Sequence, residues 1–277
     1  MTLNLADRIG SAEADAYARD GVVCLRGVIS QTWIEQMRAA ATCAMANPGP
    51  HAEQYEATET GGRFFGDLDV WQREPVFERF MRDGPAAEIA GRIMGSGATN
   101  FFYDQLLVKE PGAAARTPWH QDQPYWAVKG REVCSVWIPM DEVARETNLE
   151  FVRGSHDWPE YNPRHFIDDT PYADTGLPEL PDIEADRAAY DIFSCEIEPG
   201  DCFVFNGMTV HGAGGNASTT TRRRALTLRW TGDDVRFWRG AGEVGYPVTD
   251  PGLSNGDKMT CAAYPLIWQR SPETVET

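Results

Sequence analysis

Short strand-like segments separated by turn residues fill the chain from residue 100 onward and limit its fold most strongly. The clearest are NFFYDQLLVKEPG, EVCSVWIPMD, LEFVRGSH, FSCEIEPGDCFVFNG and RRRALTLRW, with Pro-Gly, Asn and Gly turns between them. Repeated short strands with such turns are typical of antiparallel sandwiches and barrels. We therefore predict a mainly β fold with flanking helices, whose core covers residues 100–240.

The first 99 residues favour helices, apart from a short β-branched run at 21–29. Residues 12–19 are helix-favouring, and Thr32-x-x-Glu35 has the pattern of a capping box that opens a helix through Ala46. A second helical stretch covers 74–94 and stops at the glycines of GSG. Residues 1–99 are thus predicted to form a mainly helical flank of the β core.

Two segments interrupt or follow the strands. Residues 157–191 are rich in Pro and Asp, with eight acidic residues between Asp168 and Asp191 against one arginine. This composition indicates a solvated loop inserted in the core, and the alternative is a lid over a site. Residues 241–277 form a Gly- and Pro-rich tail that we expect to pack on the core. The prediction is one domain over residues 1–277.

The charge balance bears on partners. The formal net charge is -17, from 42 acidic and 25 basic residues, and such a surface repels phosphate backbones and anionic lipids. We expect no nucleic-acid or membrane partner, and the net charge says little about a substrate held in an interior pocket. The amino terminus lacks the basic start and apolar run of a signal peptide, and the six cysteines form no CxxC pair. These features predict a cytoplasmic protein, and they leave the oligomeric state open.

The stretch TPWHQDQPYW places a histidine and an aspartate two residues apart among bulky aromatic residues. If it enters a strand, the side chains of His120 and Asp122 project from the same face. Burying two such polar groups costs free energy unless something binds them. A metal ion would satisfy both, although this short motif also arises by chance.

A second histidine follows the strand-like CFVF, just before a glycine-rich loop. Alone, His211 is best interpreted as a structural histidine with satisfied hydrogen bonds. Together with His120 and Asp122 it completes two imidazoles and one carboxylate, the facial triad of non-haem iron(II) oxygenases. Three ligands leave three of six positions for a bidentate co-substrate and dioxygen.

Three consecutive arginines open the strand-like RRRALTLRW. Adjacent strand residues face opposite ways, so Arg223 shares a face with Ala225, Thr227 and Arg229, whereas Arg222 and Arg224 share the other. An inward guanidinium could form a fork with a buried carboxylate, as the distal carboxylate of 2-oxoglutarate requires. The other interpretation is a basic cluster on the surface.

The order His-x-Asp, Gly-Ser-His, Pro-Gly-Asp, His-Gly-x-Gly and Arg-x-Ala resembles the phytanoyl-CoA dioxygenase family of Fe(II)/2-oxoglutarate-dependent oxygenases, over about residues 18–232. The resemblance implies a double-stranded β-helix (a cupin-like jelly roll) with iron at one mouth. It implies His120, Asp122 and His211 as metal ligands and catalytic residues, and Arg223 as the 2-oxoglutarate anchor.

Three further positions match the family's co-substrate region. Trp137 lies where the family places a tryptophan beside the co-substrate, Gln105 where relatives place a methionine, and Arg63 near a basic residue of the family. Each also has an ordinary interpretation: core packing for Trp137, a strand hydrogen bond for Gln105 and a surface charge for Arg63.

The chain departs from the family pattern at two positions. Ala213 stands where the family often has a serine that helps to hold 2-oxoglutarate, and Asn148 stands where a glycine is usual. The spacing from His211 to Arg223 is one residue longer than in some relatives. The halogenating branch of this wider group replaces the metal-binding aspartate with a small residue. Asp122 is retained, which favours hydroxylation or a related oxidation.

The resemblance implies an enzyme that uses Fe(II), 2-oxoglutarate and O2 to hydroxylate an unactivated C–H bond of a small metabolite, with release of succinate and CO2. Aromatic residues near the motifs are candidate pocket walls, or else core: Trp119, Tyr125, Trp126, Tyr103 and Trp238. Two alternatives stay open, a cupin-like metal-dependent isomerase or hydrolase and a non-catalytic small-molecule-binding jelly roll. The first would keep the metal set without requiring Arg223, and the complete triad disfavours the second.

Overall fold

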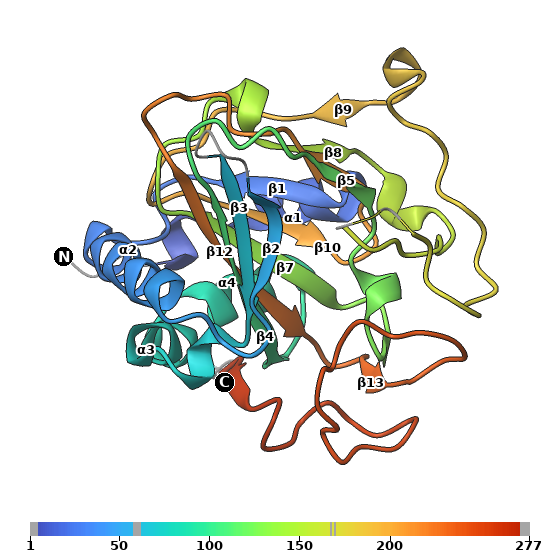
Figure 1. Cartoon of the computed structure of the whole chain (residues 1–277). Helices are drawn as coiled ribbons and strands as arrows, with labels where there is room; N and C mark the ends of the chain where they lie inside the picture. Colours follow the sequence, from blue (N-terminus) through green and yellow to red (C-terminus); the bar gives the residue numbers. More distant parts are fainter. Residues whose placement is uncertain (1–4, 58–61, 167, 169, 272–277) are drawn as a thin grey trace.

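Two facing antiparallel sheets form the centre of the computed structural model, which describes residues 5–57, 62–166, 168 and 170–271 (Figure 1). The major sheet has eight strands in the order β1-β10-β7-β12-β4-β3-β2, with β14 beside β4. Its strands are β1 (Val22–Leu25), β2 (Glu53–Ala57), β3 (Arg63–Leu68), β4 (Ala98–Lys109), β7 (Val133–Pro139), β10 (Cys202–Asn206), β12 (Arg223–Thr231) and β14 (Leu266–Gln269).

The minor sheet has the order β5-β11-β8-β9, and β13 pairs separately with β6. These strands are β5 (Thr117–His120), β6 (Val128–Lys129), β8 (Leu149–Val152), β9 (Ile192–Phe193), β11 (His211–Ala213) and β13 (Arg236–Phe237). The helices are α1 (Ser11–Asp20), α2 (Gln31–Ala46), α3 (Pro75–Asp83) and α4 (Ala86–Met94). Short 3-10 turns lie at Leu5–Asp7, Val70–Gln72, Gln123–Tyr125, Arg145–Thr147, Ser155–Asp157 and Arg187–Ala189.

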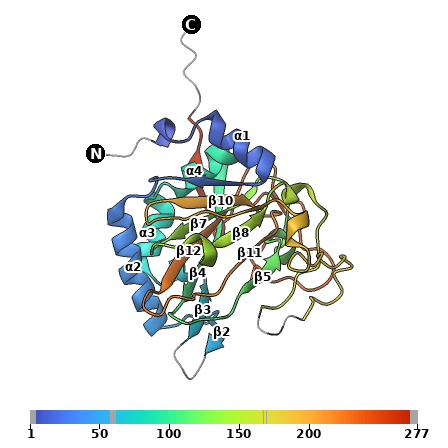
Figure 2. The ribbon, with the colours of Figure 1, turned by 90° about the horizontal axis from the view of Figure 1, so that it is seen from above.

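The helices cover one face of the major sheet, and the minor sheet lies on its other side (Figure 2). Alternation along β7 shows how the sequence produces these layers. Cys134, Val136 and Ile138 belong to the core that packs against the helices, whereas Trp137 packs between the sheets with Phe203. All seven residues of β7 are buried, because both faces of this strand are covered. The mainly β, double-stranded β-helix prediction is confirmed.

The helical predictions differ from the structure in their details. The helix expected from Thr32 begins at Gln31, and Ser30 caps it by accepting a hydrogen bond from the backbone N–H of Trp33. The stretch 74–94 forms two helices, because Gly84 before Pro85 is extended, as residues before proline prefer. Residues 1–99 also supply β1, β2 and β3, so this part of the chain contributes strands as well as helices.

The last part of the chain returns to the major sheet, where β14 pairs with β4 and Trp268 packs beside α4. A Cβ at Gly91 would lie 2.3 Å from the Trp268 ring, so no side chain fits there. We predict that Gly91→Ala lowers the free energy of unfolding by about 1–3 kcal/mol, despite alanine's better helix propensity. Urea denaturation would measure it. A Trp268→Ala background should remove most of the cost, and an equal cost in both backgrounds would contradict this packing.

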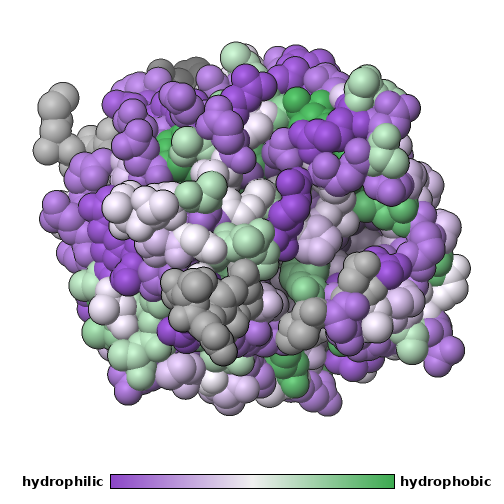
Figure 3. Space-filling view, turned by 45° about the horizontal axis from the view of Figure 1, so that its top comes forward, coloured by the Kyte–Doolittle hydropathy of each residue, from purple (hydrophilic) through white to green (hydrophobic). Residues whose placement is uncertain are grey.

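Polar residues dominate the face seen in Figure 3, with hydrophobic residues scattered among them. Among the described residues, no helix combines the length and apolar character that crossing a bilayer requires. The segment 157–191 runs largely outside the sheets and contains no strand within its described part. Some of its residues nevertheless reach the site described next.

Candidate active site

Three ligand-capable side chains meet where the two strands β5 and β11 pair. His120, the last residue of β5, lies directly opposite His211, the first residue of β11. Asp122 follows β5 and places Oδ1 3.4 Å from His120 Nε2 and 3.9 Å from His211 Nε2. Their ligand atoms all lie within 4.8 Å of one another, so one metal ion can contact all three.

Backbone carbonyls fix both imidazoles. The Nδ1 atom of His120 lies 2.8 Å from the carbonyl oxygen of Pro118, and Nδ1 of His211 lies 2.9 Å from that of Thr209. Each Nδ1–H donates to its carbonyl, so each Nε2 keeps a lone pair directed toward Asp122. This is how metal-binding histidines are usually oriented.

The electrostatics favour a cation at this point. Burial, together with the neighbouring His120, lowers the pKa of His211 to about 3, so His211 is a neutral ligand at pH 7. Burial alone would raise the pKa of Asp122, but the positive charge of Arg229, with the adjoining His120 and His211, holds it well below its usual range. The set is therefore two imidazoles and one carboxylate anion, the donors that non-haem iron(II) uses.

Ser135, on β7, holds the second oxygen of the carboxylate. Its buried hydroxyl donates to Asp122 Oδ2 at 2.9 Å, which leaves Oδ1 toward the imidazoles. We predict that Ser135→Ala weakens Fe(II) affinity about 10- to 100-fold, as expected when the hydrogen-bond partner of a metal ligand is lost.

Competition with a metal chelator would measure this affinity. Ser96→Ala is the matched control, since Ser96 is also buried and hydrogen-bonded, but to Glu132 and to the carbonyl of Ala98. It should lower stability without changing Fe(II) affinity. Equal Fe(II) affinity in Ser135→Ala and the unmodified chain would contradict the proposed role of the hydroxyl.

The triad opens into a cavity of about 220 Å³. Alternate residues of β12 form one wall, namely Arg223, Ala225, Thr227 and Arg229, as the strand periodicity predicts. Residues of β4, β7 and the loops complete it, among them Tyr103, Gln105, Leu107, Lys109, Trp137, Tyr125, Trp126 and Tyr246. Aromatic rings therefore enclose most of the space beside the metal set.

Of the three consecutive arginines, the structure places Arg223 on the cavity wall. Arg222 forms an ion pair with Glu110, and Arg224 one with Asp141, both on the other side of the strand. Arg223 donates a hydrogen bond to the backbone carbonyl of Thr147, and among the described residues no carboxylate pairs with it. Burial lowers its pKa to about 10, so it remains charged at pH 7.

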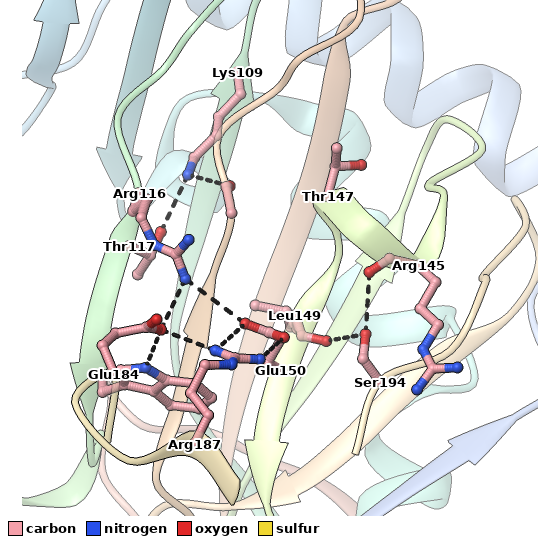
Figure 4. Close-up of polar contacts among 12 residues, drawn as sticks. Lys109, Arg116, Thr117, Arg145, Thr147, Leu149, Glu150, Glu184, Arg187 and Ser194 are labelled. Carbon is pink, nitrogen blue, oxygen red and sulfur yellow. Dashed lines mark hydrogen bonds and ion pairs between the residues drawn. The ribbon is translucent and has the colours of Figure 1, made fainter. Parts of the chain in front are cut away.

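Lys109 lies beside Arg223 on the neighbouring strand and also lines the cavity. Its ammonium donates to the backbone carbonyls of Ala115 and Gly214, at 2.8 and 2.9 Å, and lies 3.4 Å from the hydroxyl of Thr117 (Figure 4). Thr117, on β5, lies opposite Ala213, on β11. Ala213 stands where the family often has a serine, so the neighbouring strand supplies a hydroxyl beside that position. Neither Lys109 nor Thr117 stands out in the sequence, because only the pairing of β4 with β12 and of β5 with β11, in two facing sheets, brings them together.

Five of the predicted side chains lie on the cavity wall: Trp137, Gln105, Tyr103, Tyr125 and Trp126. Gln105 accepts a hydrogen bond from Arg229 at 2.9 Å, and Tyr103 accepts one from the indole of Trp126 at 2.7 Å. Their roles toward ligands stay predictions. Phe166 and Tyr172, from the inserted segment, also line the cavity, which periodicity could not reveal in a loop.

Three predicted side chains lie elsewhere and are corrected. Trp119 points away from the metal set, because it alternates with His120 on β5, and its indole donates to Glu184. Trp238 is 44% exposed, with Lys129 over its ring. Arg63 lies over the ring of Phe65 and donates to Gln54, on the face of β3 opposite the cavity-lining Phe64.

Comparison with known proteins shows the family to which the chain with this metal set belongs. The family model of phytanoyl-CoA dioxygenase (PhyH) matches residues 17–225, which is most of the chain. The chain belongs to this family. A relative, the multifunctional dioxygenase ausE of Penicillium brasilianum, is 33% identical over 234 residues, covering 77% of this chain and 69% of that protein.

Solved structures share the fold. The α-ketoglutarate-dependent carbocyclase SnoK from nogalamycin biosynthesis has a TM-score of 0.73 at 23% identity, covering 95% of this chain and 98% of that one. The epimerase SnoN, solved with Fe3+, α-ketoglutarate and nogalamycin RO, has a TM-score of 0.71 at 21% identity, covering 93% and 98%. Together with the triad, membership of the family makes this chain a non-haem iron, 2-oxoglutarate-dependent dioxygenase. The isomerase, hydrolase and non-catalytic alternatives are not retained.

Proposed function

We propose that this dioxygenase hydroxylates an unactivated C–H bond of a small metabolite, with 2-oxoglutarate anchored at Arg223. The observation that carries the proposal is the arrangement of charged and aromatic residues around one cavity. The metal set and two cationic side chains, Arg223 and Lys109, line the same cavity of about 220 Å³, whose other walls are largely aromatic. Iron together with 2-oxoglutarate and O2 supplies the oxidant that such a reaction requires.

The chain's own residues would orient the co-substrate. Arg223 presents a planar fork of donors that matches a carboxylate, and it has no carboxylate partner among the described residues. The carbonyl of Thr147 holds the guanidinium in place, and the hydroxyl of Thr117 lies nearby as a further hydrogen-bonding group. Lys109 adds positive charge to the same end of the cavity.

The aromatic walls would keep water from the reacting groups and hold the substrate. Tyr103 stacks on Tyr246 with ring centroids 4.0 Å apart, and Trp126 donates to the hydroxyl of Tyr103. Phe166 lies 4.8 Å from the ring of His120, so the inserted segment covers one side of the metal set. Aromatic walls of this kind limit the access of water to a reactive oxidant.

An anaerobic titration of the iron(II)-loaded protein with 2-oxoglutarate tests the anchor and the metal set. We expect a saturable visible charge-transfer band that is absent in His211→Ala. Candidate metabolites are then incubated with isotopically labelled O2, and a product that carries one labelled oxygen supports hydroxylation. A band without any oxygen-bearing product, but with a desaturated, cyclised or epimerised product, would overturn hydroxylation while keeping the enzyme class.

A further inference from the structure

A second arginine of β12 faces the cavity six residues after Arg223, and the co-substrate assignment does not use it. At about 3.3 Å of rise per residue, the two Cα atoms are separated by roughly 20 Å along the strand. Arg229 is 5% exposed and lies close to the metal set, with Nη2 4.0 Å from Asp122 Oδ2. One co-substrate held between the metal and Arg223 therefore leaves Arg229 for a second ligand.

The guanidinium of Arg229 has hydrogen-bond donors to spare. Nη2 donates to Gln105 Oε1 at 2.9 Å, but Nε and Nη1 are buried and have no hydrogen-bond partner among the described residues. Asp122 Oδ2 is too distant for a hydrogen bond and already accepts one from Ser135. Buried donors without acceptors are costly, so an acceptor supplied by a ligand is the expected compensation.

The surroundings of Arg229 define what such a ligand looks like. Its guanidinium lies over the ring of Tyr103, 4.7 Å from the centroid, and 6.0 Å from that of Trp126. Among the described residues that line the cavity, the cations Lys109, Arg164, Arg223 and Arg229 outnumber the carboxylates Glu53 and Asp122. Arg164 pairs with Glu179, and 2-oxoglutarate would balance the Arg223 end. The carboxylate nearest to Arg229 in the metal set is Asp122, at 4.0 Å, and a metal ion held by Asp122 would draw on that negative charge, so Arg229 would retain positive charge.

We propose that Arg229, with Gln105 beside it, binds a carboxylate of the substrate, and that the aromatic residues around it hold an apolar or cyclic body. The substrate class is thus a small organic acid rather than a neutral compound. This inference rests on the proposed function, because it assumes that the substrate occupies the cavity beside the metal. Since Arg229 touches neither Arg223 nor Lys109 in any described contact, its removal should leave 2-oxoglutarate binding intact.

Matched acids and amides test the proposal without a known substrate. Phenylalkanoic and cyclohexylalkanoic acids and their primary amides would be titrated calorimetrically, without O2, into protein loaded with Fe(II) and 2-oxoglutarate. We expect the unmodified chain to bind at least one acid ten-fold or more tightly than its amide. Arg229→Gln should abolish this preference, and Arg229→Lys should retain part of it.

The control is Arg131→Gln, which removes the same charge from a side chain that is 82% exposed and pairs with Asp157. It should keep the full preference for acids. Two results would overturn the proposal: no acid preferred over its amide by the unmodified chain, or an unchanged preference in Arg229→Gln. If Arg229→Gln loses Fe(II) affinity and keeps the preference, Arg229 serves only as a counter-charge to Asp122.

The visible band with 2-oxoglutarate separates this proposal from the function on which it rests. Absence of the band in the unmodified chain would contradict the co-substrate anchor at Arg223, whatever the acids do. A normal band in Arg229→Gln, together with loss of acid preference, would support both. A normal band with no acid preference in the unmodified chain would reject the carboxylate subsite alone.

Discussion

Replacing Arg223 by glutamine is expected to weaken 2-oxoglutarate binding about 100-fold while Fe(II) affinity stays unchanged. The guanidinium of Arg223 is a half-buried cation on the cavity wall, it has no carboxylate partner among the described residues, and desolvation lowers its pKa. Loss of charge-assisted hydrogen bonds worth about 3 kcal/mol corresponds to roughly this change in Kd. Anaerobic titration of the charge-transfer band would measure it.

Arg222→Gln is the matched control for this experiment. It removes the same charge one residue earlier, from a side chain that pairs with Glu110 on the other side of the strand. Its 2-oxoglutarate affinity should stay within about two-fold of the unmodified chain, because the Arg222 side chain is not among the residues that line the cavity. Equal weakening in both variants would indicate a general effect of charge, and no weakening in Arg223→Gln would place the anchor elsewhere.

Replacing Asp122 by alanine is expected to abolish turnover, with a loss of at least 10³-fold, and to weaken Fe(II) binding strongly. The change removes the one carboxylate of the metal set, so only the imidazoles of His120 and His211 remain of the three ligands. It also removes the hydrogen-bond acceptor of the Ser135 hydroxyl and the carboxylate that lies 4.0 Å from the guanidinium of Arg229. Fe(II) affinity and succinate release would measure the two losses.

Asp141→Ala controls for the loss of a buried carboxylate. Asp141 pairs with Arg224 on the helix side of the strand, so its removal should lower stability without weakening Fe(II) binding. If Asp122→Ala bound Fe(II) as tightly as the unmodified chain, the metal would have to lie at other ligands. Circular dichroism of both variants would show whether either loss reflects unfolding.

The strand periodicity of the sequence was enough to predict much of the site. Asp122 lies just beyond β5, outside the strand, so alternation along β5 did not place it. Alternation along RRRALTLRW places Arg223 and Arg229 on one face, with Ala225 and Thr227 between them. Local geometry fixes these relations, so they survive any tertiary arrangement of the strands. The family resemblance then assigned the metal set, and family membership confirms the enzyme class.

Local reasoning failed where aromatic residues flank a motif. Trp119 is next to a metal ligand in sequence, yet it faces the other side of β5, as the same alternation requires. Trp238 lies at the end of β13, and its ring is exposed. A residue next to a ligand in the sequence therefore need not lie in the site. The spacing along a strand, even or odd, predicts which face a side chain occupies.

The sequence by itself determined the type of fold, the order of the motifs and the face on which each strand residue lies, because these depend on local backbone geometry. Only the tertiary structure decided which strands pair and which strand faces lie against one another. Pairing of β12 with β4 and β7 brings Lys109, Gln105 and Ser135 to the metal set and the arginines. The inserted segment adds Phe166 to the cavity wall. Such contacts join residues far apart in the chain, and burial leaves Nε and Nη1 of Arg229 without an acceptor among the residues that the structure describes.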